Sequence, residues 1–534
     1  MKSSRTQQQD DAGQPAHLGG GVAPPRIARD KIKSPSDLAG VLANTRKTAG
    51  KVVLAHGVFD LLHMGHVRHL EEARSFGEIL VVSVTADKFV NKGPGRPVFN
   101  QNLRAEMLAA LACVDWVVIS EAPTAEFVIE TFKPDVYVKG VEYSDERADV
   151  TGKIISERET VERSGGKVVF THDITFSSSE LINRYIIQYE PQVRAFLDAV
   201  REKNEQTTIL NLLDSVSDMR VLVVGDTIID DYNYVMPMGK APKENLVTTL
   251  HQSREVFAGG AIATANHLAN ICGKVEVVTF FGNEPEHAKL VRASLHPNVK
   301  LTAIERARAP FTVKTRFIEP TYMRKMFEVY RMDDSPPSGD IQKKLNAIIA
   351  ERAGSYDLVV ANDFGHGMIM PSTIETLTKS ARFLAVNVQT NGGNFGFHLV
   401  TRYPRADYVC IDQLEARLSV RDRYSSVDTV VEELLASAID CSKIIVTQGS
   451  RGCIGYSRGE PTSWVPAFTD KVVDTVGAGD AFFAITSPLV AVGGAIPHAA
   501  FLGCIAGAIK VGIVGHRQAI DKTTLKKAVI ALLK

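Results

Sequence analysis

The chain has 534 residues, which exceeds the size of one ordinary hydrophobic core and predicts at least two domains. Apolar residues make up 45% and charged residues 23%, proportions that are typical of globular proteins. Lys and Arg together number 61, as do Asp and Glu, so the formal net charge is zero and no global positive field favours nucleic acid or an anionic membrane.

The sequence carries no pattern typical of secretion, membrane insertion or disulfide bonding. The first residues lack the apolar segment of a secretory signal. The most apolar stretch, 481–496, contains Pro488 and two glycines, so buried helices explain it better than a membrane span. The six cysteines are scattered without a CxxC pair, which favours a reducing compartment. We therefore expect a cytoplasmic protein.

The N-terminal part predicts a tail followed by an α/β domain. Residues 1–33 are polar and rich in Gly, Gln and Pro, and we expect them to be disordered. Residues 34–190 alternate β-rich and helical segments, which predicts a parallel, doubly wound sheet. The expected strands are 51–57, 79–87, 115–120, 135–140 and 167–172, with helices at 103–114 and 126–133.

A second α/β domain is predicted beyond a helical linker at 191–217. It covers 218–534, and its expected strands are 220–226, 275–282, 357–365, 406–412 and 443–450. Residues 313–334 predict a hairpin that crosses the sheet edge, with a turn near Glu319–Pro320. The family resemblance described below also implies a small β lid in this domain.

The string His63-Met64-Gly65-His66 lies between a predicted strand and a predicted helix. A helix N-terminus offers unpaired N–H groups to an anion, histidines can donate hydrogen bonds to phosphate, and Gly65 lets the backbone approach closely. A surface feature of the helix and a zinc site are the alternatives, although no further ligand cluster lies nearby. His69 lies outside the motif and is expected on the helix surface or in packing.

The frame Gly57-x-Phe59-Asp60-x-x-His63-x-Gly65-His66 resembles the signature of the cytidylyltransferase-like nucleotidyltransferase superfamily. The resemblance implies that His63 and His66 are catalytic and stabilise charge on the transferred phosphate without a covalent intermediate. The resemblance also makes Ser177, Ser178 and Ser179 phosphate contacts. Plain N-capping of a helix is the alternative for these serines, and the two roles are compatible. The nucleotide and phosphate contacts implied by the resemblance are Gly57, Phe59, Asp60, Gly65, Asp87, Lys92, Arg104, Lys139, Gly140, Ser177, Ser178 and Ser179.

The string DTVGAGDAFF, residues 474–483, predicts a second phosphate site. The small residues Gly477, Ala478 and Gly479 open a helix, and their N–H groups can form an anion hole for a phosphoryl group. Asp480 is placed to take a proton from an attacking hydroxyl. An ordinary Gly-rich turn with an acidic helix start is the alternative. No Walker A loop is present.

This string resembles the signature of the ribokinase-like (PfkB) sugar kinases. The resemblance implies an ATP contact at Thr447, Gly449 and Gly452, beside the anion hole. It also implies magnesium ligation by Asp412 and Glu415, where Asp412 replaces the usual Asn. The implied sugar contacts are Asp226, Asp230, Gly259 and Gly260, and turn or cap chemistry is the alternative for the two aspartates.

Taken together, the two halves resemble the bifunctional heptose 7-phosphate kinase/heptose 1-phosphate adenylyltransferases, with the domain order reversed. The resemblance implies phosphorylation of a sugar phosphate by ATP and Mg²⁺ at the anomeric position. Nucleotidyl transfer to the sugar 1-phosphate would then give an ADP-heptose-like product and pyrophosphate. Two departures leave the sugar open: Ala263 stands where those enzymes have Asn, and residues 387–396 replace an Asp-Pro-Lys element.

Two alternatives to this interpretation stay open. The same chemistries would act on a different sugar or a polyol phosphate, with CTP in place of ATP in the nucleotidyltransferase half. Otherwise one domain is inactive and serves as a binding module. In each case we expect small-molecule substrates as partners, no nucleic acid, no membrane, and a homo-oligomer.

Overall fold

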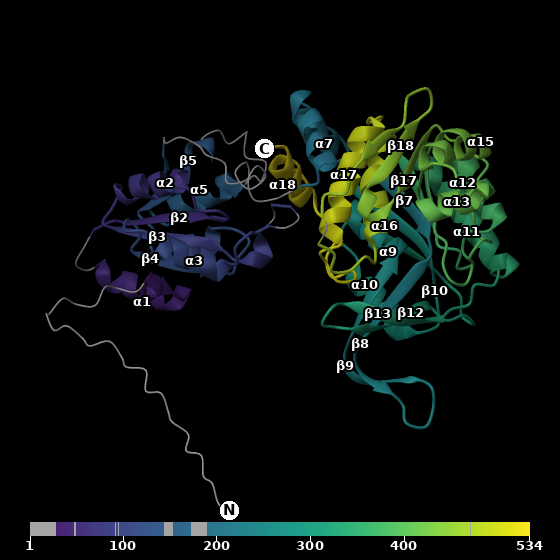
Figure 1. Ribbon diagram of the computed structural model, residues 1–534, viewed down its shortest axis with the longest axis horizontal. Coiled ribbons are helices and arrows are strands. Elements are labelled where there is room, and N and C mark those ends of the chain that lie inside the picture. Colours follow the sequence, from purple (N-terminus) through teal and green to yellow (C-terminus); the bar gives the residue numbers. More distant parts are fainter. Residues whose placement is uncertain are drawn as a thin grey trace, which may run out of the picture.

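The computed structural model describes residues 28–46, 50–90, 92–93, 96–143, 153–171, 189–469 and 471–534. Two α/β bodies lie side by side in Figure 1, the N-terminal one in purple and blue and the C-terminal one in teal to yellow. Each is built on a sheet of mainly parallel strands, so the predicted fold class is confirmed.

The N-terminal domain contains a six-stranded parallel sheet in the order β1-β4-β3-β2-β5-β6. The five predicted strands are present, each within two residues of its predicted bounds. The strands are β1 (Ile32–Lys33), β2 (Val52–Gly57), β3 (Ile79–Thr85), β4 (Trp116–Ser120), β5 (Val136–Gly140) and β6 (Lys167–Thr171). The helices are α1 (Pro35–Thr45), α2 (Met64–Arg74), α3 (Gln101–Ala109), α4 (Glu126–Phe132) and α5 (Lys153–Arg163), with 3₁₀ turns η1 (Ala28–Lys31), η2 (Asp87–Phe89) and η3 (Val141–Tyr143).

Residues 28–33, which the sequence places in the tail, are ordered as η1 and β1. Ile32 pairs with Val117 of β4, so β1 forms one edge of the sheet. Residues 1–27 of the predicted tail lie outside the described residues.

The order of the strands creates a crevice in the N-terminal domain. From β2 the chain first adds β3 and β4 on one side and then β5 and β6 on the other. In open α/β sheets, ligands bind outside the carboxyl ends of the strands where the order reverses in this way. Gly57 ends β2 at that point, so the residues that follow it line the crevice.

Helices α7 (Pro191–Glu202) and α8 (Gln206–Ser215) occupy the segment that the sequence predicts as a helical linker. Their apolar faces belong to the core of the C-terminal domain, because Leu197, Val200, Ile209 and Leu213 are buried within it. The two helices are therefore packed elements of that domain.

The C-terminal domain contains a nine-stranded sheet in the order β11-β10-β7-β14-β15-β16-β17-β18-β19, in which the pairs β17–β18 and β18–β19 are antiparallel and the other pairs are parallel. The strands are β7 (Arg220–Gly225), β10 (Lys274–Phe281), β11 (Val299–Glu305), β14 (Leu358–Asp363), β15 (Leu384–Val388), β16 (Tyr408–Asp412), β17 (Lys443–Thr447), β18 (Cys453–Ser457) and β19 (Ser463–Val465). The order reverses between β7 and β14, which places a second crevice there.

Helices cover both faces of this sheet. They are α9 (Ala261–Ala269), α10 (Pro285–Ser294), α11 (Gly339–Arg352), α12 (Pro371–Ser380), α13 (Gln413–Val420), α14 (Val427–Thr429), α15 (Ala436–Ala438), α16 (Ala478–Ala491), α17 (Ile496–Lys510) and α18 (Lys522–Leu533). Short 3₁₀ turns η5 (Ala353–Ser355), η6 (Val400–Arg402) and η8 (Gly449–Arg451), and the π-helical turn η7 (Val430–Leu435), complete the chain.

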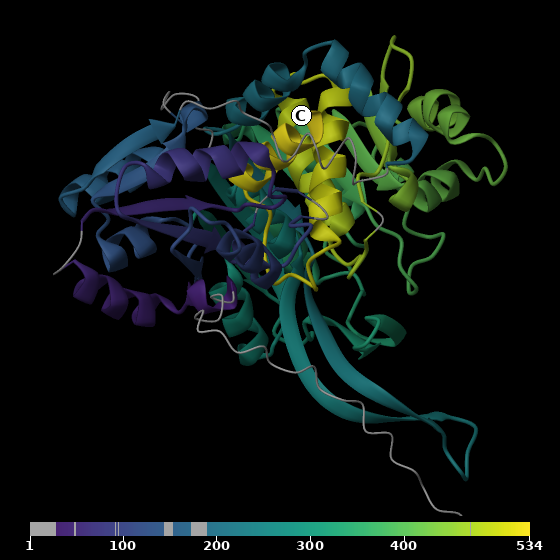
Figure 2. The same cartoon turned by 60° about the vertical axis from the view of Figure 1, so that its left-hand side comes forward.

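A separate four-stranded sheet forms the lid, in the order β13-β12-β8-β9. Its strands are β8 (Thr227–Lys240), β9 (Val247–Gly260), β12 (Thr312–Glu319) and β13 (Arg324–Arg331). The hairpin predicted at 313–334 is present as β12 and β13, but it does not cross the edge of the main sheet, because β12 pairs with β8 instead. The long β8–β9 hairpin, which the sequence does not predict, projects from the body in Figures 1 and 2.

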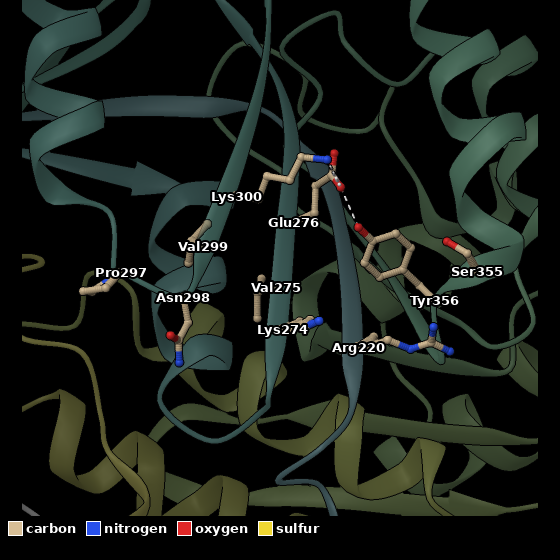
Figure 3. A pocket seen from close by; sticks show the side chains of 10 residues that line it. All are labelled: Arg220, Lys274, Val275, Glu276, Pro297, Asn298, Val299, Lys300, Ser355 and Tyr356. Atoms are coloured by element: carbon tan, nitrogen blue, oxygen red, sulfur yellow. Dashed lines mark hydrogen bonds and ion pairs between the residues drawn. The ribbon is translucent and has the colours of Figure 1, made fainter.

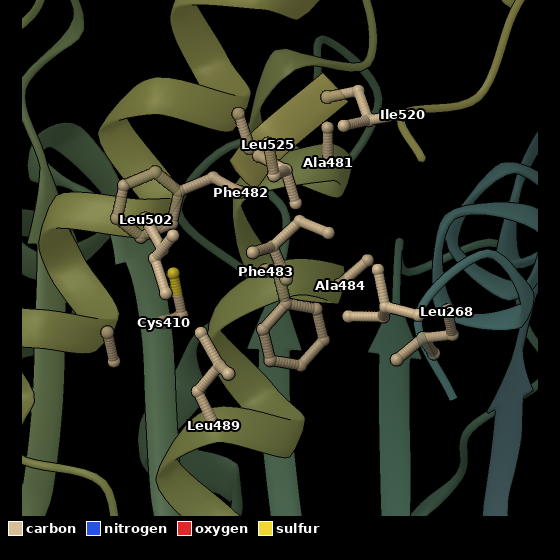
Figure 4. Close-up of a cluster of buried hydrophobic side chains, with 14 of the residues drawn as sticks. Leu268, Cys410, Ala481, Phe482, Phe483, Ala484, Leu489, Leu502, Ile520 and Leu525 are labelled. Carbon is tan, nitrogen blue, oxygen red and sulfur yellow. The ribbon is translucent and has the colours of Figure 1, made fainter. Parts of the chain in front are cut away.

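The apolar stretch 481–496 forms buried helix, as expected. Residues 481–490 of α16 are all buried. In Figure 4, Phe482 and Phe483 of α16 lie among side chains from other elements, including Leu268 of α9 and Leu502 of α17. Within the described residues, no helix combines the length and the apolar character that crossing a membrane requires.

His267, buried in α9, provides a test of this packing by pH. Burial lowers its pKa from 6.5 to about 3, and its Nδ1 accepts a hydrogen bond from the Ile520 N–H at 3.0 Å. In the unfolded chain the ring takes up a proton below pH 6.5, so it contributes a loss of stability as the pH falls from 6.5 toward 3. Between pH 6 and 5 this loss is about 1 kcal/mol.

We expect His267→Gln to remove that contribution from the free energy of unfolding of the C-terminal domain. Denaturant titrations at pH 6 and pH 5 would show a fall in stability that is about 1 kcal/mol smaller for the variant than for the wild type. Equal falls in the two proteins would contradict a buried, neutral His267.

Candidate functional site

The string His63–His66 begins α2 at the crevice of the N-terminal domain. His63 is the N-cap of the helix, and its Nδ1 accepts the Gly65 N–H at 3.1 Å. Because Nδ1 is an acceptor, the proton of a neutral ring lies on Nε2, which is then a donor. The His63 and His66 rings are 4.0 Å apart, and Phe59, with φ of 49°, packs edge-on at 5.3 Å from His66.

Both histidines are neutral near pH 7. Burial lowers the pKa of His66 to about 3, and the charges of His63 and Lys92 act in the same direction. Burial, followed by Lys92, also lowers the pKa of His63. The Nδ1 atom of His66 is buried and has no hydrogen-bond partner within the protein. Such an atom at a helix N-terminus is one that a phosphate ligand would satisfy.

Asp60 and Arg104 support the walls of this crevice. Asp60 is fully buried and accepts hydrogen bonds from Arg96 Nη1 at 2.8 Å and from the Val98 N–H at 2.6 Å. Arg104 is also fully buried, and its guanidinium donates to Asp87 Oδ1 at 2.6 Å and to the carbonyl oxygens of Phe99, Thr85 and Val58. The geometry gives these residues a supporting function, while a direct contact with substrate stays a prediction.

Two predicted lysines lie at different places in this domain. Lys92 is half-buried, and its pKa is lowered to about 8, mainly by burial. Lys139, at the end of β5 before Gly140, pairs with Glu157 at 3.0 Å and lies 5.2 Å from the ring centre of Tyr137. The three predicted serines, Ser177, Ser178 and Ser179, lie outside the described residues.

Two further histidines have packing roles. His69 lies within 2.7 Å of the Thr171 hydroxyl through Nδ1, so it joins α2 to the end of β6. His56 lies in β2 between Ser83, at 3.1 Å, and Thr85, at 3.4 Å, and burial lowers its pKa to about 3. His69 therefore packs against the sheet, one of the two expected roles.

In the C-terminal domain, the ends of β7 and β14 meet at the second crevice. Asp226 follows β7 and accepts the Phe364 N–H at 3.2 Å. Burial, together with the charge of Asp363, raises its pKa to about 7. Asp363 ends β14 and accepts hydrogen bonds from Tyr403 OH at 3.0 Å and, at 2.8 Å, from His398 Nε2. The tight burial of two carboxylates here fits a site that binds hydroxyl groups.

Asp480 lies at the start of α16, as the sequence predicts. It is 7% exposed, and burial raises its pKa, with Asp230 adding to this and His516 opposing it. Gln389 Nε2 donates to its Oδ1 at 3.0 Å. A carboxylate with a raised pKa at a helix N-terminus is suited to accept a proton.

The turn before Asp480 is compact on one side and open on the other. Gly477 has φ of 75°, and a Cβ added there would lie 2.6 Å from His516 Cε1, so only glycine fits. A Cβ added at Gly479 would meet no atom within 4 Å outside its own helix and neighbours. With Ala478 between them, these residues leave space for an anion beside the helix start.

Asp230 is the centre of a buried ion-pair network. Its Oδ1 accepts from Arg316 Nη1, and its Oδ2 lies 3.2 Å from His516 Nε2. Burial pushes its pKa up, but the contacts with His516 and Arg316 outweigh burial and lower it. Gly259 packs directly on this carboxylate, and Gly260, with φ of 61°, packs on the Asp226 carbonyl. The sugar contacts predicted for these four positions stay predictions.

The sequence prediction missed three basic residues around Asp480 and Asp230. Lys314 and Arg316 both lie in β12 of the lid, and His516 follows α17. The charges of Lys314 and His516 both act to lower the pKa of Asp480. Lys314 and Arg316 are two residues apart, so their side chains lie on the same face of the strand. This spacing is the feature of the sequence that could have predicted a charged face there.

The predicted ATP and metal residues lie at or just after the carboxyl ends of β16 and β17. Thr447 ends β17, and Gly449, with φ of 60°, begins η8. A Cβ at Gly452 would lie 2.0 Å from the Val465 carbonyl, so this glycine serves strand packing. Asp412 and Glu415 form a capping box on α13, with Glu415 accepting the Asp412 N–H at 2.8 Å.

Glu415 has a raised pKa, which a bound cation would lower. Burial, and repulsion from Asp412 and Asp480, raise its pKa to about 7. Across the described ranges, no group of three or more His, Cys, Asp or Glu side chains is arranged to hold a metal ion. Two carboxylates still fit Mg²⁺, which keeps several waters and binds substrate phosphates.

The C-terminal domain has two hollows, one beside these motifs and one at the other end of the sheet. A small one beside the second crevice is lined by Asp226, Arg306, Asp333 and His366, and both ring nitrogens of the buried His366 lack a partner within the protein. A cavity of about 390 Å³, seen in Figure 3, lies at the opposite, amino ends of β7, β10 and β11. Glu276 in it already binds Lys300 and Tyr356, and it contains none of the predicted residues.

Comparison with known proteins separates the two halves of the chain. Residues 218–523 match the pfkB family carbohydrate kinase model, and residues 54–184 match the cytidylyltransferase-like model. The N-terminal part is 42% identical over 162 residues to the bifunctional protein HldE of Citrifermentans bemidjiense, covering 30% of this chain and 32% of that protein. It is 47% identical over 141 residues to HldE of Geotalea uraniireducens, covering 26% and 27%.

The match therefore spans about a third of the length of these curated relatives. Among solved structures, the phosphofructokinase-2 of Escherichia coli in complex with potassium aligns with 59% of this chain and 100% of its own, at 17% identity and a TM-score of 0.48. Arabidopsis thaliana ribokinase, complexed with ribose and ATP, aligns with 59% of this chain and 99% of its own, at 17% identity and a TM-score of 0.45.

Arg104 provides a test of the first site. Replacing it with Met leaves the Thr85 and Phe99 carbonyl oxygens without their donor and Asp87 without its ion-pair partner. We expect Arg104→Met to lower the free energy of unfolding of the N-terminal domain by about 3 kcal/mol. The measurement is denaturant unfolding, with Arg68→Met as the control because Arg68 is exposed on α2. A loss no larger than that of the control would contradict the supporting role.

Proposed function

Since the match over more than half of its length shows that this chain belongs to the pfkB carbohydrate kinase family, we propose that it is a bifunctional enzyme that makes a nucleotide-activated sugar. The C-terminal domain would phosphorylate a sugar phosphate at its anomeric position. The cytidylyltransferase-like domain, which precedes it, would transfer a nucleotidyl group to a sugar 1-phosphate, which forms from the bisphosphate once a separate phosphatase has removed the other phosphate.

One observation carries the proposal. Each signature string opens a helix at the carboxyl ends of a parallel sheet, beside the point where the strand order reverses. The helix starts supply N–H groups for phosphate at the place where such sheets bind ligands. Each helix start also has the side chain that the proposed chemistry needs, His63 and His66 in one domain and Asp480 in the other.

In the kinase step, the Asp480 carboxylate takes the proton of the anomeric hydroxyl as its oxygen attacks the γ-phosphorus of ATP. The bond between the γ-phosphorus and the bridging oxygen breaks, and ADP leaves. The open side of the Gly477–Gly479 turn would hold the transferring phosphoryl group with backbone N–H donors. Lys314, buried in the lid, adds positive charge near Asp480.

In the nucleotidyl transfer, a phosphate oxygen of the sugar 1-phosphate attacks the α-phosphorus of the nucleoside triphosphate. The bond from the α-phosphorus to the oxygen that leads to the β-phosphate breaks, and pyrophosphate leaves. His63 donates through Nε2 and His66 through a ring nitrogen to the phosphate oxygens, where negative charge increases in the transition state. Both act as neutral donors, in agreement with their lowered pKa values.

ATP and Mg²⁺ are the cofactors we propose. Asp412 and Glu415 would hold Mg²⁺ in the kinase domain, and bound Mg²⁺ would keep Glu415 ionised by lowering its pKa. The ion supplies charge neutralisation for the phosphates of ATP. ATP is also the nucleotide we propose for the second domain, with CTP as the alternative.

A heptose phosphate is the sugar that the similarity to HldE supports best. The departures at Ala263 and in 387–396 favour keeping a different sugar or a polyol phosphate as the second candidate. Gln389, from the altered segment, contacts Asp480, so that segment lines the reaction site. The hollow with His366 and Arg306 beside Asp226 offers polar groups for the far end of the sugar. A chain with one inactive, ligand-binding domain is the remaining alternative.

A product panel tests the proposed substrates. We expect the purified chain, given ATP, Mg²⁺ and heptose 7-phosphate, to form a heptose bisphosphate that mass spectrometry detects. Given heptose 1-phosphate and ATP or CTP, it should form a nucleotide sugar and pyrophosphate. Fructose 6-phosphate and ribitol 5-phosphate serve as comparison substrates. Turnover of these alone would replace the heptose, and binding of nucleotide without any product would favour the inactive-domain alternative.

Single substitutions test which domain carries out which reaction. We expect Asp480→Ala to lower the kinase rate by about 10²–10⁴-fold and to leave nucleotidyl transfer unchanged, because a general base contributes that much. We expect His66→Ala to lower nucleotidyl transfer by about 10²–10³-fold and to leave the kinase unchanged. The two rates are measured separately on each variant. A variant that keeps its assigned activity within a few-fold of the wild type would remove that residue from the mechanism.

Self-association of the chain stays a prediction. The β8–β9 hairpin exposes apolar side chains near its tip, which supports an interface with a second copy. They are Met236, Met238, Leu246, Val247 and Leu250.

A further inference from the structure

Helix α18 of the C-terminal domain lies against the N-terminal domain. In Figure 1 it is the part of the C-terminal body that comes next to the N-terminal one, and Figure 2 shows the same neighbours from another side. The contact is with the loop that carries Lys92, between η2 and α3. A Cβ placed on Gly93 would lie 3.4 Å from Ala528 Cβ and 3.5 Å from Ala528 Cα. The backbone of this loop therefore packs directly on α18.

The position of α18 is held from the side of its own domain. Arg201 of α7 donates to the Leu532 carbonyl at 2.7 Å and to the Lys534 carbonyl at 3.3 Å. Lys526, in the middle of the helix, pairs with Asp214 of α8 at 2.7 Å. Leu525, Ala528 and other α18 side chains belong to the core of that domain. A rigid element thus meets the loop of the other domain.

The contact gathers positive charge beside the phosphate site. Arg96 and Lys92 come from the loop, and Lys527 and Lys534 come from α18 and its end; the last two both act on the pKa of Lys92, in the same direction as Arg96. Asp60, whose charge acts to raise the pKa of Lys92, is already bound by Arg96 and by the Val98 N–H.

The same lysine connects α18 to the catalytic string. Lys92 precedes Gly93, which packs on Ala528, and its charge acts on the pKa of both His63 and His66, so one loop is near the rings and near α18. Positive charges that converge on one place create a potential that attracts an anion of high charge. A nucleoside triphosphate, with its α-phosphate at the histidines, would extend its highly charged β- and γ-phosphates toward such a cluster.

We propose that α18 completes the nucleotidyltransferase site, with Lys527 and Lys534 binding the β- and γ-phosphates of the nucleoside triphosphate and the pyrophosphate that leaves. This inference rests on the proposed nucleotidyl transfer and adds a contribution from the other domain to it. Nucleotidyl transfer then requires that the C-terminal domain packs against the N-terminal one, but it does not require kinase activity.

The experiment uses the full chain and inorganic pyrophosphate as the probe. We expect Lys527→Ala to weaken the binding of pyrophosphate, measured by calorimetry, by about tenfold, and to raise the KM for the nucleoside triphosphate by a similar factor. Lys526→Ala is the matched control, because the Lys526 side chain binds Asp214 of α8. This variant should change the pyrophosphate affinity and the KM by less than about twofold. The kinase rate should be the same in all three proteins.

Lys534→Ala is the second variant, since Lys534 is exposed and its loss leaves the core intact. It should weaken pyrophosphate binding in the same direction. If both variants bind pyrophosphate as tightly as Lys526→Ala, the proposed role of α18 is wrong, whatever the enzyme makes. If the wild type binds pyrophosphate through Lys527 but forms no nucleotide sugar from any sugar phosphate, the proposed function fails and the α18 subsite stands.

Discussion

The reversal of strand order in a parallel sheet is the constraint on which both sites depend. In each domain, the chain forms a central strand, β2 or β7, adds two strands on one side of it and later returns to the other side. The loops on the two sides of that point diverge, so the carboxyl end of the central strand faces a crevice. Residues that follow the central strand therefore lie beside the crevice: His63 at the start of α2 in one domain and the buried Asp226 in the other.

Buried charge is the second common feature of the two sites. Asp60 and Arg104 in the first site, and Asp230 with Arg316 in the second, have almost no exposed surface. A buried charge is costly unless it is paired, so each of these groups fixes the position of its partners. In the second site both members of the pair come from the lid, because Asp230 lies in β8 and Arg316 in β12, and His516, which follows α17, contacts Asp230 from the body. The network around Asp230 thus couples the lid to the body beside Asp480.

The packing of α18 on the N-terminal domain gives the order of the two domains a physical consequence. With the nucleotidyltransferase domain first, the last helix of the kinase domain lies beside the loop that carries Lys92. A positively charged helix in that position adds to the field at the phosphate site without any change in the local sequence of the N-terminal domain.

The sequence by itself determined the class of each domain and the two helix starts to which the proposed chemistry is assigned. Alternating apolar strands and helices predict parallel sheets, and the strings ending at His66 and Asp480 lie where local patterns alone place them. Local pattern did not reveal the β8–β9 hairpin, because its outer half is exposed and Pro237, Gly239 and Pro242 interrupt it, so that it looks like a loop. Nor did it reveal which charges surround Asp480.

Only the tertiary structure decided those partners, because they come from segments far apart in the chain. Lys314 and His516 meet Asp480 through the lid and through the end of α17, and Gly93 meets Ala528 across the two domains. Periodicity and motif spacing describe neighbours within one element, whereas these contacts depend on how separate elements pack. The proposed chemistry of each site therefore follows from its motif, whereas its electrostatic surroundings were set by packing.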